Sequence, residues 1–219
     1  MTVRTPAPAP APTSTPASAT ALLALWNDLD PAVDEADYDD WHACEHVPER
    51  CTVPGILWGL RYRHTGGLAM PRYLTLYGLA DATVLDSAPY QRLLREPTPA
   101  SRAMRPALRN LSRWVCTLQV ATADIHAWAP LVVLALDRQA DADRPDVACG
   151  LPLWLADRLH DATPLPWLAA GQARASVVGD RLLCVQLPDG SAALPAWRSD
   201  PRAARYDRIG GPAPQRRMP

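Results

Sequence analysis

Chemically active side chains are densest in the segment YDDWHACEHVPER, which runs from Tyr38 to Arg50. A helix with about 100° per residue predicts one face shared by Tyr38, His42, Glu45 and Glu49, flanked by Trp41 and His46. A carboxylate beside an imidazole raises the pKa of the ring and fixes its tautomer, which prepares a general base. An ordinary polar helix face, with side-chain pairs three and four residues apart, accounts for the same pattern.

The same segment matches a zinc motif. His42, Glu45 and His46 fit H-x-x-E-H, the inverted zinc-protease pattern. That chemistry needs a third ligand, usually a downstream glutamate, and Glu96 in a Pro-rich stretch is the only one after Glu49. Pro48 also shortens the helix that would hold both imidazoles. We therefore expect no metal, and Cys44 and Cys51 lack an arrangement that would favour a nucleophilic thiolate.

Composition narrows the class of partner. The chain has 219 residues, a formal net charge of -1 and 48% apolar residues. Near-neutral charge argues against a nucleic acid or an anionic membrane as partner, and no apolar run approaches the ~20 residues of a membrane helix. Five cysteines without a C-x-x-C pair indicate reduced thiols, and no signal peptide is visible. We expect a cytoplasmic protein with a small-molecule substrate.

Hydrophobic patterns predict four strands and two helices in a first half, residues 21–122. Extended segments are expected at Ala21–Trp26, Ile56–Arg63, Arg72–Leu79 and Arg113–Val120. Helices are expected over Asp37–Glu49 and Asp81–Leu94, the first followed by the breaker Pro54-Gly55. This β-α-β-β-α-β order is a ferredoxin-like unit, whose antiparallel sheet has helices on one face and leaves the other bare.

A similar order recurs, at low identity, in a degenerate second half over residues 128–198. Strands are expected at Leu131–Leu136 and Arg181–Pro188, an extended stretch at Leu165–Ala175, and helices at Leu153–His160 and Ser191–Trp197. Each bare sheet face must be buried, and the other half supplies the cover. The fold class is thus α+β with two tandem ferredoxin-like halves. Pro/Ala-rich residues 1–20 and Arg/Pro/Gly-rich residues 199–219 are expected to be a disordered and a loose tail.

The first half resembles the EthD-like dimeric α/β-barrel proteins. The resemblance covers about residues 21–120 and rests on DYDDWHACEHVPERCTVPG, RYLTLYGL, SAPY and EPTP. The family typically has W-x-x-x-E-H-x-P-E-R and V-P-G-F, so His42 is an additional histidine and Ile56 stands where Phe is usual. The resemblance implies sheets that pair into a barrel, here within one chain, and a site between sheet and helices. It leaves a homodimer open.

Site roles follow from the resemblance. It assigns His46 as the acid/base, Glu45 or Glu49 as its orienter and Arg50 as a charge stabiliser. The pocket residues are expected to be Trp41, His42, Tyr38 and Tyr77. When Trp154 is aligned with Trp41, Arg158 and Leu159 replace Glu45 and His46. One site per chain is therefore expected.

The wider superfamily includes cofactor-free monooxygenases, polyketide cyclases, isomerases and lyases, and also haem enzymes. The leading interpretation is a cofactor-independent enzyme that acts on an apolar or aromatic metabolite by His-based acid/base chemistry. The alternatives are a non-catalytic binding protein and a haem protein with His42, His46 or His64 as ligand. A buried His–carboxylate pair would favour the enzyme, and a cavity filled by side chains would favour the binder.

Overall fold

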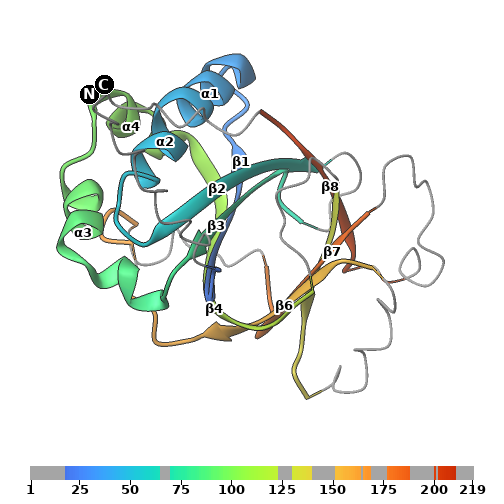
Figure 1. The fold of residues 1–219 in the computed structure, drawn as a ribbon. Coiled ribbons are helices and arrows are strands. Elements are labelled where there is room, and N and C mark those ends of the chain that lie inside the picture. The colour runs from blue at the N-terminus through green and yellow to red at the C-terminus, as the bar shows by residue number, and fades with distance from the viewer. Residues whose placement is uncertain are drawn as a thin grey trace, which may run out of the picture.

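The strands form a closed antiparallel barrel (Figure 1). The computed structural model describes residues 18–64, 70–122, 130–139, 151–163, 165–168, 177–187, 200 and 202–210. The strands are β1 Ala21–Leu29, β2 Ile56–His64, β3 Tyr73–Leu79, β4 Leu108–Ala121, β5 Leu131–Leu136, β6 Leu153–Leu159, β7 Arg181–Gln186 and β8 Ala204–Arg208. The four extended segments expected in the first half are confirmed.

The first half contributes four adjacent strands, and the second half together with strand β8, which follows it, contributes four more in the same relative order. One side of the barrel is β4-β1-β3-β2, and the other is β8-β5-β7-β6. The two sides join through antiparallel pairing of β2 with β8 and of β4 with β6. The described part of the second half contains strands but no helix. The structure therefore establishes an α+β barrel of two four-stranded sheets and leaves the second ferredoxin-like unit a prediction.

The predicted helix over Leu153–His160 is wrong, because this segment is strand β6. Its backbone pairs with β4 on one edge and with β7 on the other. Trp154 and Ala156 alternate into the barrel interior. A short apolar run fits either a helix or a strand. Here the strand is favoured because β4 and β7 supply hydrogen-bond partners for the backbone groups on both edges.

Strand β8 corrects the prediction of a loose tail over residues 199–219. It pairs with β2 and β5 and so closes the barrel. Tyr206 is fully buried, and its hydroxyl donates to the Pro71 carbonyl at 2.6 Å. Residues 1–17 and 211–219 of the two predicted tails and the predicted helix Ser191–Trp197 lie outside the described residues. Of the predicted stretch Leu165–Ala175, the described part Leu165–Leu168 forms a turn.

The first sheet is buried on both faces. Along β1, Leu22, Ala24 and Trp26 point into the barrel, whereas Leu23 packs in the core beneath the helices. Large rings occupy the barrel interior, among them Trp26, Trp114, Trp154, Tyr62 and Tyr206. The rings of Trp26 and Trp114 meet edge to face at 5.4 Å between centroids. The interior is a packed core, so space for a ligand must be sought under the helices.

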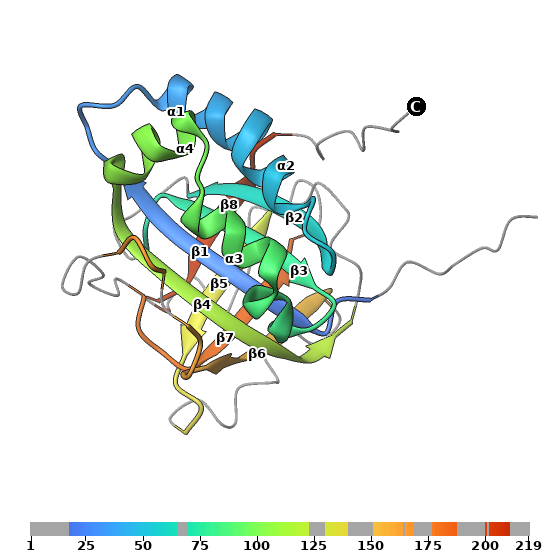
Figure 2. The same ribbon diagram turned by 90° about the vertical axis from the view of Figure 1, so that its left-hand side faces the viewer.

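The helices cover the outer face of β1, β3 and β4 (Figure 2). They are α1 Glu35–Trp41, the π-helical turn His42–His46, α2 Val47–Arg50, α3 Ala88–Arg95 and α4 Pro99–Met104, with 3₁₀ turns at Ala82–Asp86 and Arg105–Ala107. Asp34, Ser87 and Thr98 cap α1, α3 and α4 through side-chain oxygens. Both helices predicted in the first half are thus present, each interrupted. None of the described helices has the length and hydropathy of a membrane span.

Candidate active site between the first sheet and its helices

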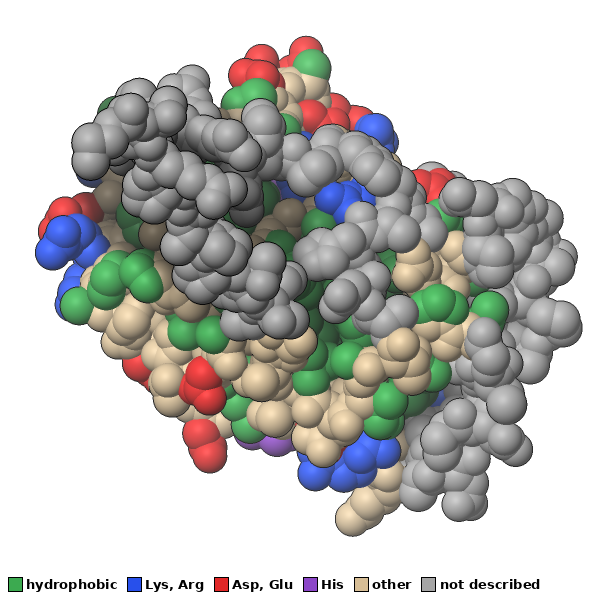
Figure 3. All heavy atoms as spheres, in the orientation of Figure 1, with side chains coloured by type: hydrophobic (Ala, Val, Ile, Leu, Met, Phe, Trp, Pro, Cys, Tyr) green, Lys and Arg blue, Asp and Glu red, His purple; other side chains and the backbone are tan. Residues whose placement is uncertain are grey.

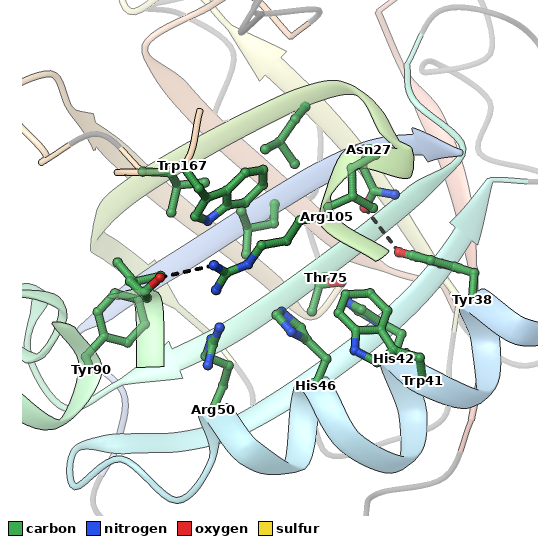
Figure 4. A pocket seen from close by; sticks show the side chains of 15 residues that line it. Asn27, Tyr38, Trp41, His42, His46, Arg50, Thr75, Tyr90, Arg105 and Trp167 are labelled. Carbon is green, nitrogen blue, oxygen red and sulfur yellow. Dashed lines mark hydrogen bonds between the residues drawn. The ribbon is translucent and has the colours of Figure 1, made fainter. Parts of the chain in front are cut away.

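The motif segment forms one helical rod from Glu35 to Arg50 whose middle widens into a π turn. The Val47 N–H donates to the His42 carbonyl, five residues back, which defines a π turn. Such turns are rare and are often found at functional sites. Because the turn holds more than the 3.6 residues of an α-helix, side chains four positions apart come into line. The rod turns one row of residues toward the sheet: Tyr38, His42, His46 and Arg50 (Figure 4).

Ion pairs fix the start of the rod on the sheet. Glu35 pairs with Arg72, which directly precedes β3, and Asp39 pairs with the buried Arg61 of β2. On the face shown in Figure 3, acidic side chains gather over α1, which is where these pairs form. Further along, Val47 packs directly on β2 because Gly59 has no side chain: a Cβ there would lie 2.7 Å from Val47 Cγ1.

Hydrogen bonds join the π turn to α4. The Thr98 hydroxyl donates to Glu45 Oε1, and the Ser101 hydroxyl donates to the same oxygen at 3.4 Å. Trp41 Nε1 in turn donates to Ser101 Oγ at 3.3 Å. Glu45 therefore holds the rod in place from the α4 side, and the EPTP segment supplies its partner.

A cavity of about 50 Å³ lies between the rod and the outer face of the sheet. Strands β1, β3 and β4 form its floor, α3 contributes Tyr90 and Leu94, and Leu165 and Trp167 of the second half close another side (Figure 4). This volume holds a few water molecules. Five of the eight predicted site residues line it: Tyr38, Trp41, His42, His46 and Arg50.

Two imidazoles stack in the cavity wall. The rings of His42 and His46 lie 5.1 Å apart at 20°, and Trp41 lies 4.7 Å from the His46 ring. His42 is 6% exposed, and the Nδ1 atoms of both rings are buried without a hydrogen-bond partner in the described structure. Burial lowers the pKa of both rings well below the usual value; His46 next adds to the effect at His42, and Arg50 does so at His46. Both imidazoles are therefore neutral at pH 7.

Two guanidinium groups face the same cavity. Arg50 is 4% exposed and donates to Glu49 Oε2 at 2.9 Å. Arg105 donates to the Leu94 carbonyl at 3.1 Å and lies 5.2 Å from the ring centroid of Trp167. Burial lowers the pKa of Arg105, and the charge of Arg50 lowers it further. Two guanidinium groups thus approach one apolar cavity. Glu49 offsets part of the Arg50 charge, whereas Arg105 forms no ion pair within the described structure, so the cavity is a favourable place for an anionic group.

Comparison with known proteins addresses the fold. No family model and no curated protein sequence matches the chain. The chain shares its fold with an anthrone oxidase-like protein. The two align with a TM-score of 0.54 over 89% of this chain and 93% of that chain, at 9% identity. A protein of Fusobacterium nucleatum subsp. nucleatum, provisionally assigned as a monooxygenase, aligns with a TM-score of 0.48 at 11% identity. The alignment covers 88% of this chain and 94% of that chain. At such identities the likeness shows the fold alone.

Three predicted site residues lie away from the cavity lining. Glu45 contacts α4, and Glu49 pairs with Arg50, so neither is seen to orient His46. Tyr77 is packed in the core between sheet and helices, where burial raises its pKa well above the usual value. A uniform 100° per residue would place both glutamates on the face of His42, whereas the π turn rotates them away from the cavity.

Other lining residues were not anticipated as site residues. The main ones are Arg105, Trp167, Tyr90, Asn27 and Thr75. Tyr90 belongs to the SAPY motif and could have been found there. Arg105 is one of many arginines in the first half, and Trp167 lies beyond the motif-bearing half, so nothing in the sequence distinguishes them.

The residues named for the metal, haem and thiol alternatives can be placed in the described structure. No group of three or more metal-ligating side chains is found within the described residues. His42 and His46 stack on each other beside a cavity of about 50 Å³, which by itself is smaller than a haem macrocycle. His64 lies elsewhere, with Nδ1 2.7 Å from the Arg205 carbonyl. Burial raises the pKa of the Cys51 thiol to about 11, and a hydrogen bond to Asp40 raises that of Cys44, so both thiols are protonated at pH 7.

Proposed function

We propose that the protein is a small-molecule enzyme of the EthD-like kind and that the cavity under the rod is its active site. The observation that carries the proposal is the meeting of a neutral histidine, His46, with two guanidinium groups, Arg50 and Arg105, at one apolar cavity. All of these groups come from one chain.

His46 would act as the base. Its ring points into the cavity (Figure 4), and its lowered pKa keeps a nitrogen lone pair free at pH 7. Removing a proton from a carbon that is conjugated with a carbonyl, directly or through an aromatic ring, breaks the C–H bond, forms an N–H bond on His46 and leaves negative charge on the carbonyl oxygen. Arg50 and Arg105 would stabilise that oxyanion in surroundings of low dielectric. No bound cofactor enters this step.

The charges also link binding to basicity. In the free protein, Arg50 and Arg105 lower the pKa of His46 and so weaken it as a base. A negative charge on the substrate would offset the guanidinium charges and raise that pKa again. His46 would therefore become a stronger base as the oxyanion develops, which is the property a general base needs.

The apolar walls favour an aromatic or apolar substrate. Trp41, Trp167 and several leucines line the cavity. The structural neighbour is named for anthrone, a tricyclic aromatic ketone with an acidic methylene group, and this makes anthrone a rational first probe. The step after proton removal decides between isomerase, lyase, cyclase and monooxygenase chemistry.

Proton exchange tests the proposal without requiring that later step. Anthrone is incubated with the protein in D₂O, and loss of its methylene proton signal is followed by NMR. We expect exchange faster than in buffer alone, and about 10²–10⁴-fold slower with His46→Gln. His160→Gln, on an exposed histidine, is the matched control and should keep the rate. Equal rates for both variants would exclude His46 as the base.

A non-catalytic binding protein is the second candidate. It is favoured by the small volume of the cavity and by the packed barrel interior. For this alternative, anthrone or a similar ring compound should bind without proton exchange, and His46→Gln should leave the affinity unchanged.

A further inference from the structure

A second, larger cleft adjoins the cavity under the rod. It has a volume of about 950 Å³, within the range of small-molecule sites. It runs along the ends of α3 and α4 and the start of β4, with Trp167 and Leu168 of the second half opposite. We call it the outer cleft, and the cavity of about 50 Å³ the inner cavity.

The lining of the outer cleft carries positive charge only. Its charged members are Arg95, Arg102, Arg105 and Arg109, and none of the described residues that line it is acidic. Arg109 pairs with Asp30 and is thereby neutralised. Arg95 and Arg102 are exposed and form no ion pair within the described structure. Three guanidinium groups therefore remain to face a ligand in the cleft.

The two spaces share a wall. Leu94, Arg105, Leu108, Leu111 and Trp167 line both of them. Arg105 stands at this junction, held by the Leu93 and Leu94 carbonyls and covered by the Trp167 ring. Its lowered pKa has Arg102 among its smaller causes, so the charge of the outer cleft is felt at the junction. A ligand that reached past Arg105 would occupy both spaces.

The inner cavity by itself is too small for a whole ring system such as anthrone, so the rest of such a ligand would have to lie in the outer cleft, which is large and cationic. We infer that the substrate has two parts, an apolar reactive head that reaches the inner cavity and an oxyanion-bearing part that lies in the outer cleft against Arg95 and Arg102. Guanidinium groups bind carboxylate, sulfonate and phosphate oxygens through paired N–H donors. The inference rests on the proposed use of the inner cavity and adds the charge class of the substrate.

Two fluorescent probes with the same ring system provide the test. 1-Anilinonaphthalene-8-sulfonate carries an anionic group, and N-phenyl-1-naphthylamine lacks it. Each is titrated into the full-length protein at low and at high salt, for wild type, for the double variant Arg95→Gln/Arg102→Gln and for Arg92→Gln. Arg92 is the matched control because it is exposed on the same helix as Arg95 but lies outside the cleft lining.

We expect the sulfonate probe to bind more tightly than the neutral one, and the double variant to weaken its binding about 3- to 10-fold, as for two exposed charge contacts. High salt should weaken the sulfonate probe alone. The affinity for the neutral probe should change neither in the double variant nor at high salt. Arg92→Gln should leave the affinity for the sulfonate probe unchanged. Equal affinity of the two probes, or equal weakening in the double variant and in Arg92→Gln, would overturn the inference.

The His46→Gln protein separates this inference from the proposed function. Loss of proton exchange with a retained sulfonate preference supports both. In a second outcome, neither wild type nor variant accelerates the exchange of anthrone protons, while the sulfonate probe still binds more tightly through Arg95 and Arg102. In that case the proposed chemistry is wrong and the inference of an anion-binding outer cleft is supported. If exchange occurs and the probes bind alike, the substrate is uncharged and the inference fails alone.

Discussion

The buried histidine pair should make the fold sensitive to mild acid. His42 and His46 are neutral in the folded protein because burial and neighbouring guanidinium charges lower the pKa of both rings. In the unfolded chain each ring returns to the ordinary value of about 6.5. As the pH falls below that value, the unfolded state takes up protons that the folded state refuses. The free energy of unfolding is therefore highest above pH 6.5 and falls as the pH falls.

The size of the effect follows from this linkage. A ring that stays neutral in the folded state lowers the free energy of unfolding by RT ln(1 + 10^(6.5−pH)), because only the unfolded state binds the proton. This loss is about 1.4 kcal/mol at pH 5.5. Two rings give about 2.8 kcal/mol between pH 8 and pH 5.5, since the cost near pH 8 is close to zero. This is an upper value for His46, which is less fully buried than His42. A loss of this size is a large part of the stability of an ordinary domain.

Urea denaturation at a series of pH values between 8 and 5.5 measures the loss. The comparison is between wild type and His42→Gln/His46→Gln, because glutamine keeps a polar side chain but does not titrate. His64 and His160 are present in both proteins, so their contribution cancels in the difference. We expect the double variant to lose about 2–3 kcal/mol less than wild type over this range. Parallel curves for the two proteins would refute the assignment of two neutral buried rings.

Three further changes test the packing around the site and the barrel. Thr98→Val removes the hydroxyl that donates to Glu45 and caps α4, so it should cost about 1–3 kcal/mol in a thermal melt; an unchanged Tm would mean that this tie contributes nothing. Tyr206→Phe should cost about 1 kcal/mol and Tyr206→Ala about 3–5 kcal/mol in urea, because the ring fills the interior where β8 closes the barrel; similar losses for both would argue that the ring is not packed there. Trp114→Ala should cost about 3–5 kcal/mol by the same measurement and Trp167→Ala much less, because Trp114 is fully buried whereas Trp167 is partly exposed; the reverse order would contradict the packed interior.

The strands of the first half could be predicted from the sequence because their signal is local. The run ALLALW is apolar on both faces, as a strand buried on both sides must be, and RYLTLYGL lies between turn signals. The helical rod was equally visible in the motif segment. The side chains that reach the cavity from the rod, such as His46 and Arg50, could therefore be predicted as well, because they all lie on this one helix.

Strands β6 and β8 could not be predicted, because their partners decide them. LWLADRL fits a short helix as well as a strand, and ARYDR lies in an Arg- and Pro-rich stretch whose composition is typical of a loose tail. In the folded chain β6 fills the gap between β4 and β7, and β8 fills the gap between β2 and β5. Each gap offers backbone donors and acceptors on two sides, which outweighs weak local preference.

The sequence determined which helix carries the site, and the tertiary structure decided what that helix faces. In the folded chain the π turn places His46 at the cavity, while Glu45 accepts a hydrogen bond from Thr98 of the α4 side. Arg105 and Trp167 line the same cavity as His46 although both lie far from it along the chain. Such a meeting is set by barrel closure, because only closure brings the turn after β6 against the helices of the first half.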